Sequence, residues 1–174
     1  MEEYAKTLKL VSYLLEYPDA AWWQEFPAYR GSVPELGTPQ AREVLEEFFG
    51  YIEDLGAKEY ETQYVRSFDF SQNTNLYLTT QNRTDFGKQS NEMLEYKHLV
   101  LENGYDLGNE LPDYLPALLE LCANVPKANA KRILATARSK IEVLRERFIE
   151  AKLAHAFLLD VVFTQASGLE GDAA

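Results

Sequence analysis

The feature that most constrains this chain is the spacing of its apolar residues, which recur three or four positions apart along almost its whole length. That spacing places them on one side of an α-helix, whereas a half-buried strand would show them at every second position. The first segment is typical, and its face consists of Tyr4, Leu8, Val11, Leu14 and Leu15. No segment shows a convincing alternating pattern, and there is no internal repeat. The sequence therefore predicts an all-α fold, a single-domain helical bundle of six to eight helices.

Prolines, glycines and small polar residues divide this pattern into segments. Residues 27–37 hold two prolines and two glycines, and residues 69–83 are rich in Asn, Gln, Ser and Thr, so we predict loops there. The second loop includes the apolar run 76–78, which has no obvious strand partner and for which we expect one helical turn. The expected helices cover residues 2–16, 38–55, 58–68, 84–103, 112–125 and 129–165, with a helical turn over 20–26 and a break near 151–154.

Capping residues predict where several helices start. Thr38 offers a hydroxyl N-cap, and Pro39 suits the first helical position. Pro112 is expected to begin one helix and Asn129 to cap the last long helical region. We expect one domain over residues 1–166 and a frayed acidic tail over residues 167–174.

The composition narrows the classes of partner. The formal net charge is −11, and so acidic a surface repels nucleic acid and anionic lipid heads. It suits a cationic peptide, and it equally serves solubility. The single cysteine, Cys122, cannot form an internal disulfide and lies among leucines on a helical face, so we predict a core residue rather than a nucleophile. The acidic N-terminus and the lack of a long apolar run predict a soluble cytoplasmic protein.

The search for catalytic motifs finds none that is complete. The chain has no Walker glycine loop, no GxGxxG motif and only two histidines. Glu95 and His98 form a Glu-x-x-His pair, which is half of a di-iron bundle site, but a second such pair is missing. We interpret the two residues as part of a solvated helix face and keep a metal-dependent helical-bundle enzyme as an alternative. We assign no catalytic residue, no metal ligand and no permanently bound cofactor.

The connector over residues 109–116 is unusual because two carboxylates, Glu110 and Asp113, flank Pro112 beside Tyr114. One interpretation is structural, since negative charge at a helix N-terminus is favoured by the helix dipole. The other is functional, since a rigid pair of carboxylates beside a tyrosine is suited to a cationic partner.

Three stretches make the sequence resemble the NarJ/TorD family of redox-enzyme maturation chaperones. The start, residues 10–19 (LVSYLLEYPD), is similar to the opening of nitrate reductase assembly chaperones. Residues 64–69 (YVRSFD) resemble a Tyr-x-x-Leu-Phe motif, with Ser67 in place of leucine. Residues 110–116 (ELPDYLP) resemble a Glu-x-Pro-Asp-His motif, with Tyr114 in place of histidine. The missing imidazole puts any role that needs a proton switch at this position in doubt.

The resemblance implies a system-specific chaperone that binds the basic N-terminal leader of a molybdoenzyme catalytic subunit, with the nitrate reductase alpha subunit as the best candidate. It implies that the client, not the chaperone, receives bis-molybdopterin guanine dinucleotide, and that the chaperone is a monomer or a domain-swapped dimer. A helical leader would lay its apolar face in a groove while carboxylates pair with its Arg or Lys. The expected peptide-binding residues are Tyr64, Phe68, Asp69, Glu110, Pro112, Asp113, Tyr114 and Glu120. A generic helical adaptor with some other partner is the remaining alternative.

Overall fold

Helix α1 (Glu3–Leu15) runs through the middle of the molecule, and ten of its thirteen residues are buried. In this computed structural model, which describes residues 1–82, 85–106 and 108–171, α6 (Leu115–Asn124) and α8 (Ala156–Gly171) pack along α1. Such burial on all sides explains why the apolar residues of α1 extend beyond a single stripe. One direct tie is the hydroxyl of Ser12, which donates to the carbonyl oxygen of Pro116 in α6 at 2.7 Å.

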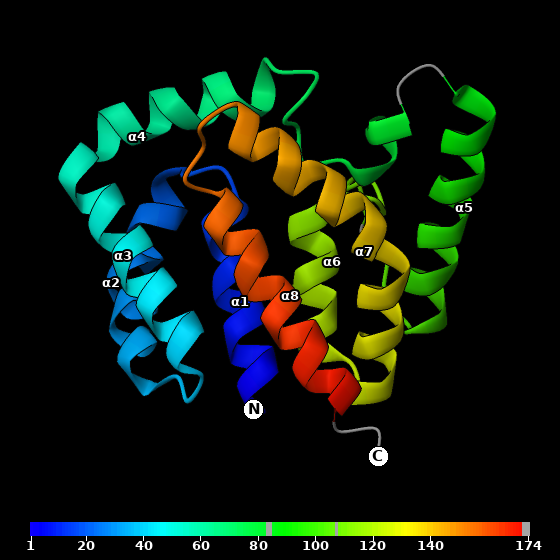
Figure 1. Cartoon of the computed structure of the whole chain (residues 1–174), viewed down its shortest axis with the longest axis horizontal. Helices are drawn as coiled ribbons and strands as arrows, with labels where there is room; N and C mark the ends of the chain where they lie inside the picture. Colours follow the sequence, from blue (N-terminus) through cyan, green and yellow to red (C-terminus); the bar gives the residue numbers. More distant parts are fainter. Residues whose placement is uncertain (83–84, 107, 172–174) are drawn as a thin grey trace.

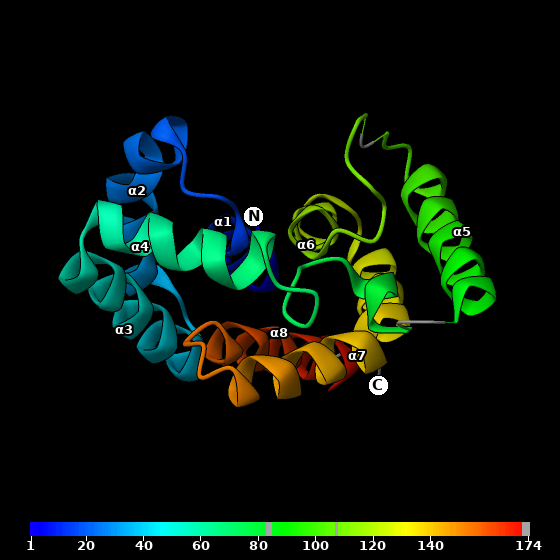
Figure 2. The ribbon, with the colours of Figure 1, turned by 90° about the horizontal axis from the view of Figure 1, so that it is seen from above.

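The other helices lie on either side of this centre (Figures 1 and 2). One side holds α2 (Ala20–Ser32), α3 (Pro39–Leu55) and α4 (Ala57–Tyr64). The other side holds α7 (Lys127–Glu150), next to α6 and α8, and α5 (Phe86–Glu102) at the outer edge. Three short segments complete the described chain, the 3-10 turns η1 (Val33–Glu35) and η3 (Leu78–Asn82) and the π-helical turn η2 (Val65–Asp69).

The prediction of an all-α bundle is confirmed, with eight α-helices in the described residues. Backbone pairing of the β type is limited there to an isolated antiparallel bridge between Tyr77 and Tyr114. The run 76–78 therefore has a partner that the sequence did not reveal. The predicted helical turn in this loop is η3, which follows the bridge.

Helix α2 corrects the first predicted loop, because it continues through Pro27 to Ser32. A proline inside a helix removes one backbone hydrogen bond, but the aromatic packing of this helix compensates. Trp22 and Tyr29 both stack on Tyr13 of α1, with ring centroids 4.6 and 4.0 Å away. Tertiary packing therefore overrides the local signal of the proline.

Two predicted helix starts are wrong. Helix α6 begins at Leu115 rather than at Pro112, and Pro116 occupies its first turn. Residues 111–114 form a turn before the helix, in which the Tyr114 amide donates to the Leu111 carbonyl at 3.1 Å. Helix α7 begins at Lys127, so Asn129 does not cap it. By contrast, α3 begins at Pro39 as predicted, although the Thr38 side chain makes no capping hydrogen bond.

The C-terminal helix is longer than predicted. The expected break after α7 is present, with Lys152 at a φ of 59°, and α8 then runs to Gly171 instead of ending near residue 165. Leu169 is buried near its end, which explains why the helix continues past the expected end. Of the expected tail, residues 172–174 lie outside the described residues, as does Thr84 in the predicted start of α5.

Candidate functional site

Two of the predicted peptide-binding residues, Tyr64 and Phe68, lie inside the molecule. The Tyr64 hydroxyl donates to the carbonyl oxygen of Leu15 at 2.6 Å, and burial raises its pKa. The Phe68 ring packs edge-on against Phe148 and His155, with centroids 5.6 and 4.8 Å away. Both side chains therefore belong to the packed interior and offer almost no exposed surface to a peptide.

Asp113 is also buried, with no exposed surface at all. Its Oδ2 accepts hydrogen bonds from the Thr79 amide at 3.0 Å and from the Thr79 hydroxyl at 2.6 Å. Backbone bonds tie the same segments together, since Leu78 donates to the Asp113 carbonyl and Leu115 donates to the Leu76 carbonyl. Asp113 thus fastens η3 to the start of α6. The Oδ1 atom is buried without a partner among the described residues.

The other predicted residues lie at or near the surface. Asp69, Glu110 and Glu120 are exposed, and Pro112 is half-buried. Tyr114 is half-buried with its ring 5.0 Å from that of Tyr77. The two carboxylates that flank Pro112 therefore differ in orientation. That of Asp113 points into the molecule and holds η3, whereas that of Glu110 is exposed to solvent and can meet a partner.

The structure adds a residue that the sequence reading missed, Glu16 at the C-terminal cap of α1. Its pKa is raised to about 7 by burial and by the carboxylates of Glu120, Glu25, Asp19 and Glu110, in order of decreasing effect. These groups come from α6, from α2 and its N-cap, and from the connector before α6. We call Glu16, Asp19, Glu25, Glu110 and Glu120 the acidic cluster.

The acidic cluster has no internal counter-charge. Within the described chain, none of its five members forms an ion pair, and only Asp19 has a structural duty, as the N-cap that accepts from the Trp22 amide at 2.9 Å. Two tyrosines lie beside the cluster. Tyr17 is 47% exposed, and burial, followed by the carboxylates of Glu25 and Glu16, raises the pKa of Tyr29. Carboxylates and tyrosine faces without a cation are suited to hold Arg or Lys from another molecule.

An apolar groove continues from the cluster toward α5. It has a volume of about 300 Å³ and lies between α5 and residues 108–112, where Met93, Leu101 and Leu111 contribute apolar surface. Leu101 is 54% exposed and Leu111 is 50% exposed. The charged residues in the lining of the same groove are Glu110, Asp106 and Lys97 of α5, so Glu110 belongs to both the groove and the acidic cluster.

The residues of the enzyme alternative lie elsewhere. Glu95 and His98 are exposed on α5 and line a polar cleft of about 350 Å³ that also includes Arg132 of α7. In the part of the chain that the structure describes, no group of three or more His, Cys, Asp or Glu is placed to hold a metal ion.

Cys122 is buried as predicted, and burial raises the pKa of its thiol to about 12. No helix among the described residues is both long and apolar enough to cross a membrane.

Comparison with known proteins identifies the family of the chain. Residues 35–157 match the family model described as nitrate reductase delta subunit. The chain belongs to this family. It is 32% identical over 157 residues to the "Probable nitrate reductase molybdenum cofactor assembly chaperone NarJ" of Bacillus subtilis (strain 168), covering 90% of this chain and 85% of that protein. It is 29% identical over 165 residues to NarJ of Escherichia coli (strain K12), covering 92% of this chain and 69% of that protein.

A third relative has a different architecture. The nitrate reductase-like protein NarX of Mycobacterium tuberculosis is 32% identical over 104 residues, which is 58% of this chain but only 16% of that protein. The two NarJ relatives match along most of their length, so the chain is a NarJ-type member of the family. NarJ proteins are assembly chaperones, and this membership, rather than the polar cleft on α5, decides against the enzyme alternative.

Proposed function

We propose that this protein is a cytoplasmic chaperone for nitrate reductase assembly that binds the basic N-terminal leader of the catalytic subunit. The observation that carries the proposal is the acidic cluster, in which the half-buried Glu16 lies near four other carboxylates and none of the five acids forms an ion pair among the described residues. An Arg or Lys of the leader would supply the missing positive charge. The two NarJ relatives are named as nitrate reductase molybdenum cofactor assembly chaperones, which supports the proposal.

The leader would be held in two ways. Its cationic side chains would meet Glu110, Glu120 and Glu25, while its apolar face would occupy the groove between α5 and residues 108–112, as amphipathic helices do in apolar grooves. Each exposed ion pair contributes only about 0.2–1 kcal/mol, so the groove is expected to supply most of the affinity. The charges would set the orientation of the leader and its rate of association.

The consequence for the client follows from occupancy of the leader. While the leader is bound, it is unavailable for the contacts it makes in the assembled enzyme, and the client stays open for insertion of bis-molybdopterin guanine dinucleotide. The cofactor is cargo of the client in this proposal, and we assign it no site on the chaperone. A monomer is sufficient for this role because the acidic cluster and the groove come from one chain.

Calorimetry with a synthetic peptide of the cognate leader tests the proposal. We expect the affinity to fall as salt is raised, because exposed ion pairs are screened. The double change Glu110→Gln/Glu120→Gln should weaken binding by about two- to thirtyfold, which is the range for two exposed pairs. Leu101→Ser in the groove should weaken it independently.

A matched control is available on α3. Glu43 and Glu47 are exposed and do not contribute to the pKa of Glu16, so Glu43→Gln/Glu47→Gln makes the same change in net charge away from the cluster. Equal effects of the two double changes would show that only net charge matters. If the wild-type protein does not bind the leader at all, the proposal is wrong and the generic adaptor becomes the better description.

A further inference from the structure

An apolar pocket separate from the leader groove lies between α1, the end of α2 and η1. It has a volume of about 340 Å³, and Leu10, Tyr29 and Leu36 are among its apolar lining residues. Leu10 and Leu36 belong to the core beneath the pocket, whereas Tyr29 is half-buried. The pocket shares no lining residue with the groove between α5 and residues 108–112, so the leader site proposed for that groove does not include it.

The charges in this pocket have no partners within the described chain. Lys6 and Lys9 line it together with a single acid, Glu35. None of these three side chains takes part in an ion pair or a side-chain hydrogen bond with a described residue. The pocket therefore has one positive charge in excess, in a protein whose net charge is −11. We call it the lysine pocket.

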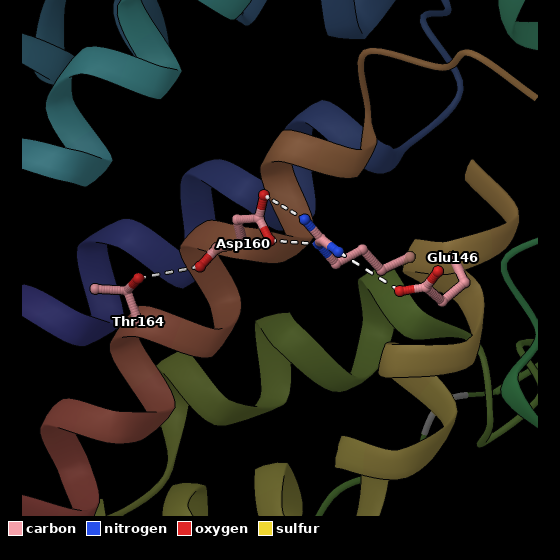
Figure 3. Close-up of polar contacts among 4 residues, drawn as sticks. Glu146, Asp160 and Thr164 are labelled. Carbon is pink, nitrogen blue, oxygen red and sulfur yellow. Dashed lines mark hydrogen bonds and ion pairs between the residues drawn. The ribbon is translucent and has the colours of Figure 1, made fainter. Parts of the chain in front are cut away.

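Arg145 of α7 shows the opposite situation. Its guanidinium bonds to both carboxylate oxygens of Asp160 and pairs with Glu146 at 3.7 Å, as Figure 3 shows. An acid from another molecule would have to displace these partners, so Arg145 offers it little attraction. A carboxylate that approaches Lys6 and Lys9 meets cations that no acid of the described chain holds.

The lysine pocket and the acidic cluster lie along the same face of α1. With 3.6 residues per turn, Lys6, Lys9, Tyr13 and Glu16 fall on one side of the helix. A rise of 1.5 Å per residue puts Glu16 about 10 Å from Lys9 and about 15 Å from Lys6 along the axis. Between them, Tyr13 stacks on Tyr29, which lines the pocket, with ring centroids 4.0 Å apart.

Tyr29 also lies near the acidic cluster. Burial, followed by the carboxylates of Glu25, Glu16 and Glu120, raises its pKa. Figure 2 shows α2 and residues 108–114 on one side of the molecule, with α7 and α8 on the other. The lysine pocket and the acidic cluster are therefore neighbouring parts of one surface, and their excess charges have opposite signs.

We infer that the lysine pocket receives a carboxylate of the leader, with an adjacent apolar side chain, while an Arg or Lys of the same leader lies in the acidic cluster. This inference rests on the proposed function and adds a direction to it. A reversed leader would bring its acid to the cluster and its cation to Lys6 and Lys9, and such like-charge contacts are costly.

The spacing along α1 turns this inference into a requirement on the leader. A separation of about 10–15 Å corresponds to seven to ten residues of a helix. A helical leader should therefore carry an acid seven to ten residues from an Arg or Lys, on the same face as that cation. A leader that is basic throughout lacks the group that the lysine pocket would bind.

Calorimetry with the cognate leader peptide tests the inference. Lys6→Gln/Lys9→Gln should weaken binding by about two- to fivefold, the range for one exposed ion pair. The direction is informative, because loss of two cations from an acidic protein would by itself strengthen the attraction of a basic peptide. The matched control is Lys58→Gln/Lys88→Gln, at exposed positions of α4 and α5. It should leave the affinity unchanged or raise it slightly.

The peptide supplies the second half of the test. Replacing its acid at the required spacing by the amide should weaken binding to the wild type and should have no further effect in Lys6→Gln/Lys9→Gln. Such non-additivity identifies a direct interaction between the carboxylate and the lysines. Ala28→Glu, at an exposed position in the pocket lining, should also weaken binding, because its carboxylate would repel the acid of the leader. All variants should keep the wild-type melting temperature.

The outcomes separate this inference from the proposed function. Leader binding that depends on Glu110 and Glu120 but not on Lys6 and Lys9 overturns the inference and leaves the proposed function standing. Additive losses from the lysine and peptide changes also overturn it, because the carboxylate would then bind elsewhere. A cognate leader without an acid at the required spacing has the same meaning. Absence of leader binding by the wild type overturns both proposals.

Discussion

The surroundings of His155 and of Glu16 make an informative comparison, because burial shifts the pKa of both groups. His155 lies in the core, where burial lowers its pKa to about 3. Its Nε2 lies 3.2 Å from the Tyr60 hydroxyl, and the rings of Phe48 and Phe68 enclose it. Glu16 lies at the edge of the bundle, where burial and four carboxylates raise its pKa to about 7.

The difference between the two sites is completeness. The imidazole has a hydrogen-bond partner and remains neutral, so the core around His155 satisfies its own polar groups. The acidic cluster leaves like charges together with no cation among the described residues to offset them. Repulsion of this kind costs stability, and a bound cation would relieve it. The first region is therefore complete within the fold, whereas the second lacks a counter-charge that, under the proposed function, the leader would supply.

The largest expected effect is a loss of stability on substitution of Phe68, which packs against His155 in the core and should matter for folding but not for leader binding. Phe68→Ala should lower the free energy of unfolding by about 3–5 kcal/mol, because it removes a buried ring and leaves a cavity beside Phe148 and His155. Urea denaturation measures this loss. Well below the melting temperature, affinity for the leader peptide should be nearly unchanged. A large loss of affinity with little loss of stability would mean that Phe68 contacts the peptide directly.

A smaller effect is expected at Asp113, and it distinguishes the two acids of the connector. Asp113→Ala leaves the buried Thr79 amide without its acceptor, which costs about 1–3 kcal/mol of stability. Glu110→Ala should hardly change stability, because the side chain is exposed, but should weaken leader binding at low salt. Thermal unfolding and calorimetry on the two variants give this crossed pattern. The same response from both variants would remove the distinction between a structural and a binding carboxylate.

The sequence predicted the helical fold well because apolar periodicity is a local property. Its errors lie where distant contacts decide the outcome. Helix α2 passes through Pro27 because its aromatic rings stack on Tyr13 of α1. Asp113 points inward because Thr79, 34 positions earlier, supplies its donors.

The proposed binding surface could be predicted only in part from the sequence, for the same reason. Glu110 and Glu120 were predicted from the resemblance, and both belong to the acidic cluster. Glu16 was overlooked even though it lies in the stretch 10–19 that resembles the family. Its significance depends on the packing of α1 against α6, which brings it near Glu120, and no local pattern encodes that contact.

The smallest expected effect is in the pH dependence of stability of Glu16→Gln. The contributions of Glu16 and His155 to stability change with pH in opposite directions. The folded pKa of Glu16 lies above its ordinary value of 4.5, so between pH 4.5 and 7 the folded protein binds more protons than the unfolded chain, and this group's contribution to stability falls as pH rises. His155 acts in reverse, because its folded pKa lies below 6.5, and its contribution is lost as pH falls below that value. Glu16→Gln should therefore be more stable than the wild type above pH 7 and equally stable below pH 4.5.

Leader binding adds a second readout, because a bound cation favours the charged carboxylate and the wild type should bind more tightly as pH rises through 7. Glu16→Gln should lose that dependence while the Glu43→Gln/Glu47→Gln control keeps it. A wild-type affinity that is flat across this range would mean that no cation of the leader reaches Glu16, and would move the leader's charged contacts outward to Glu110 and Glu120.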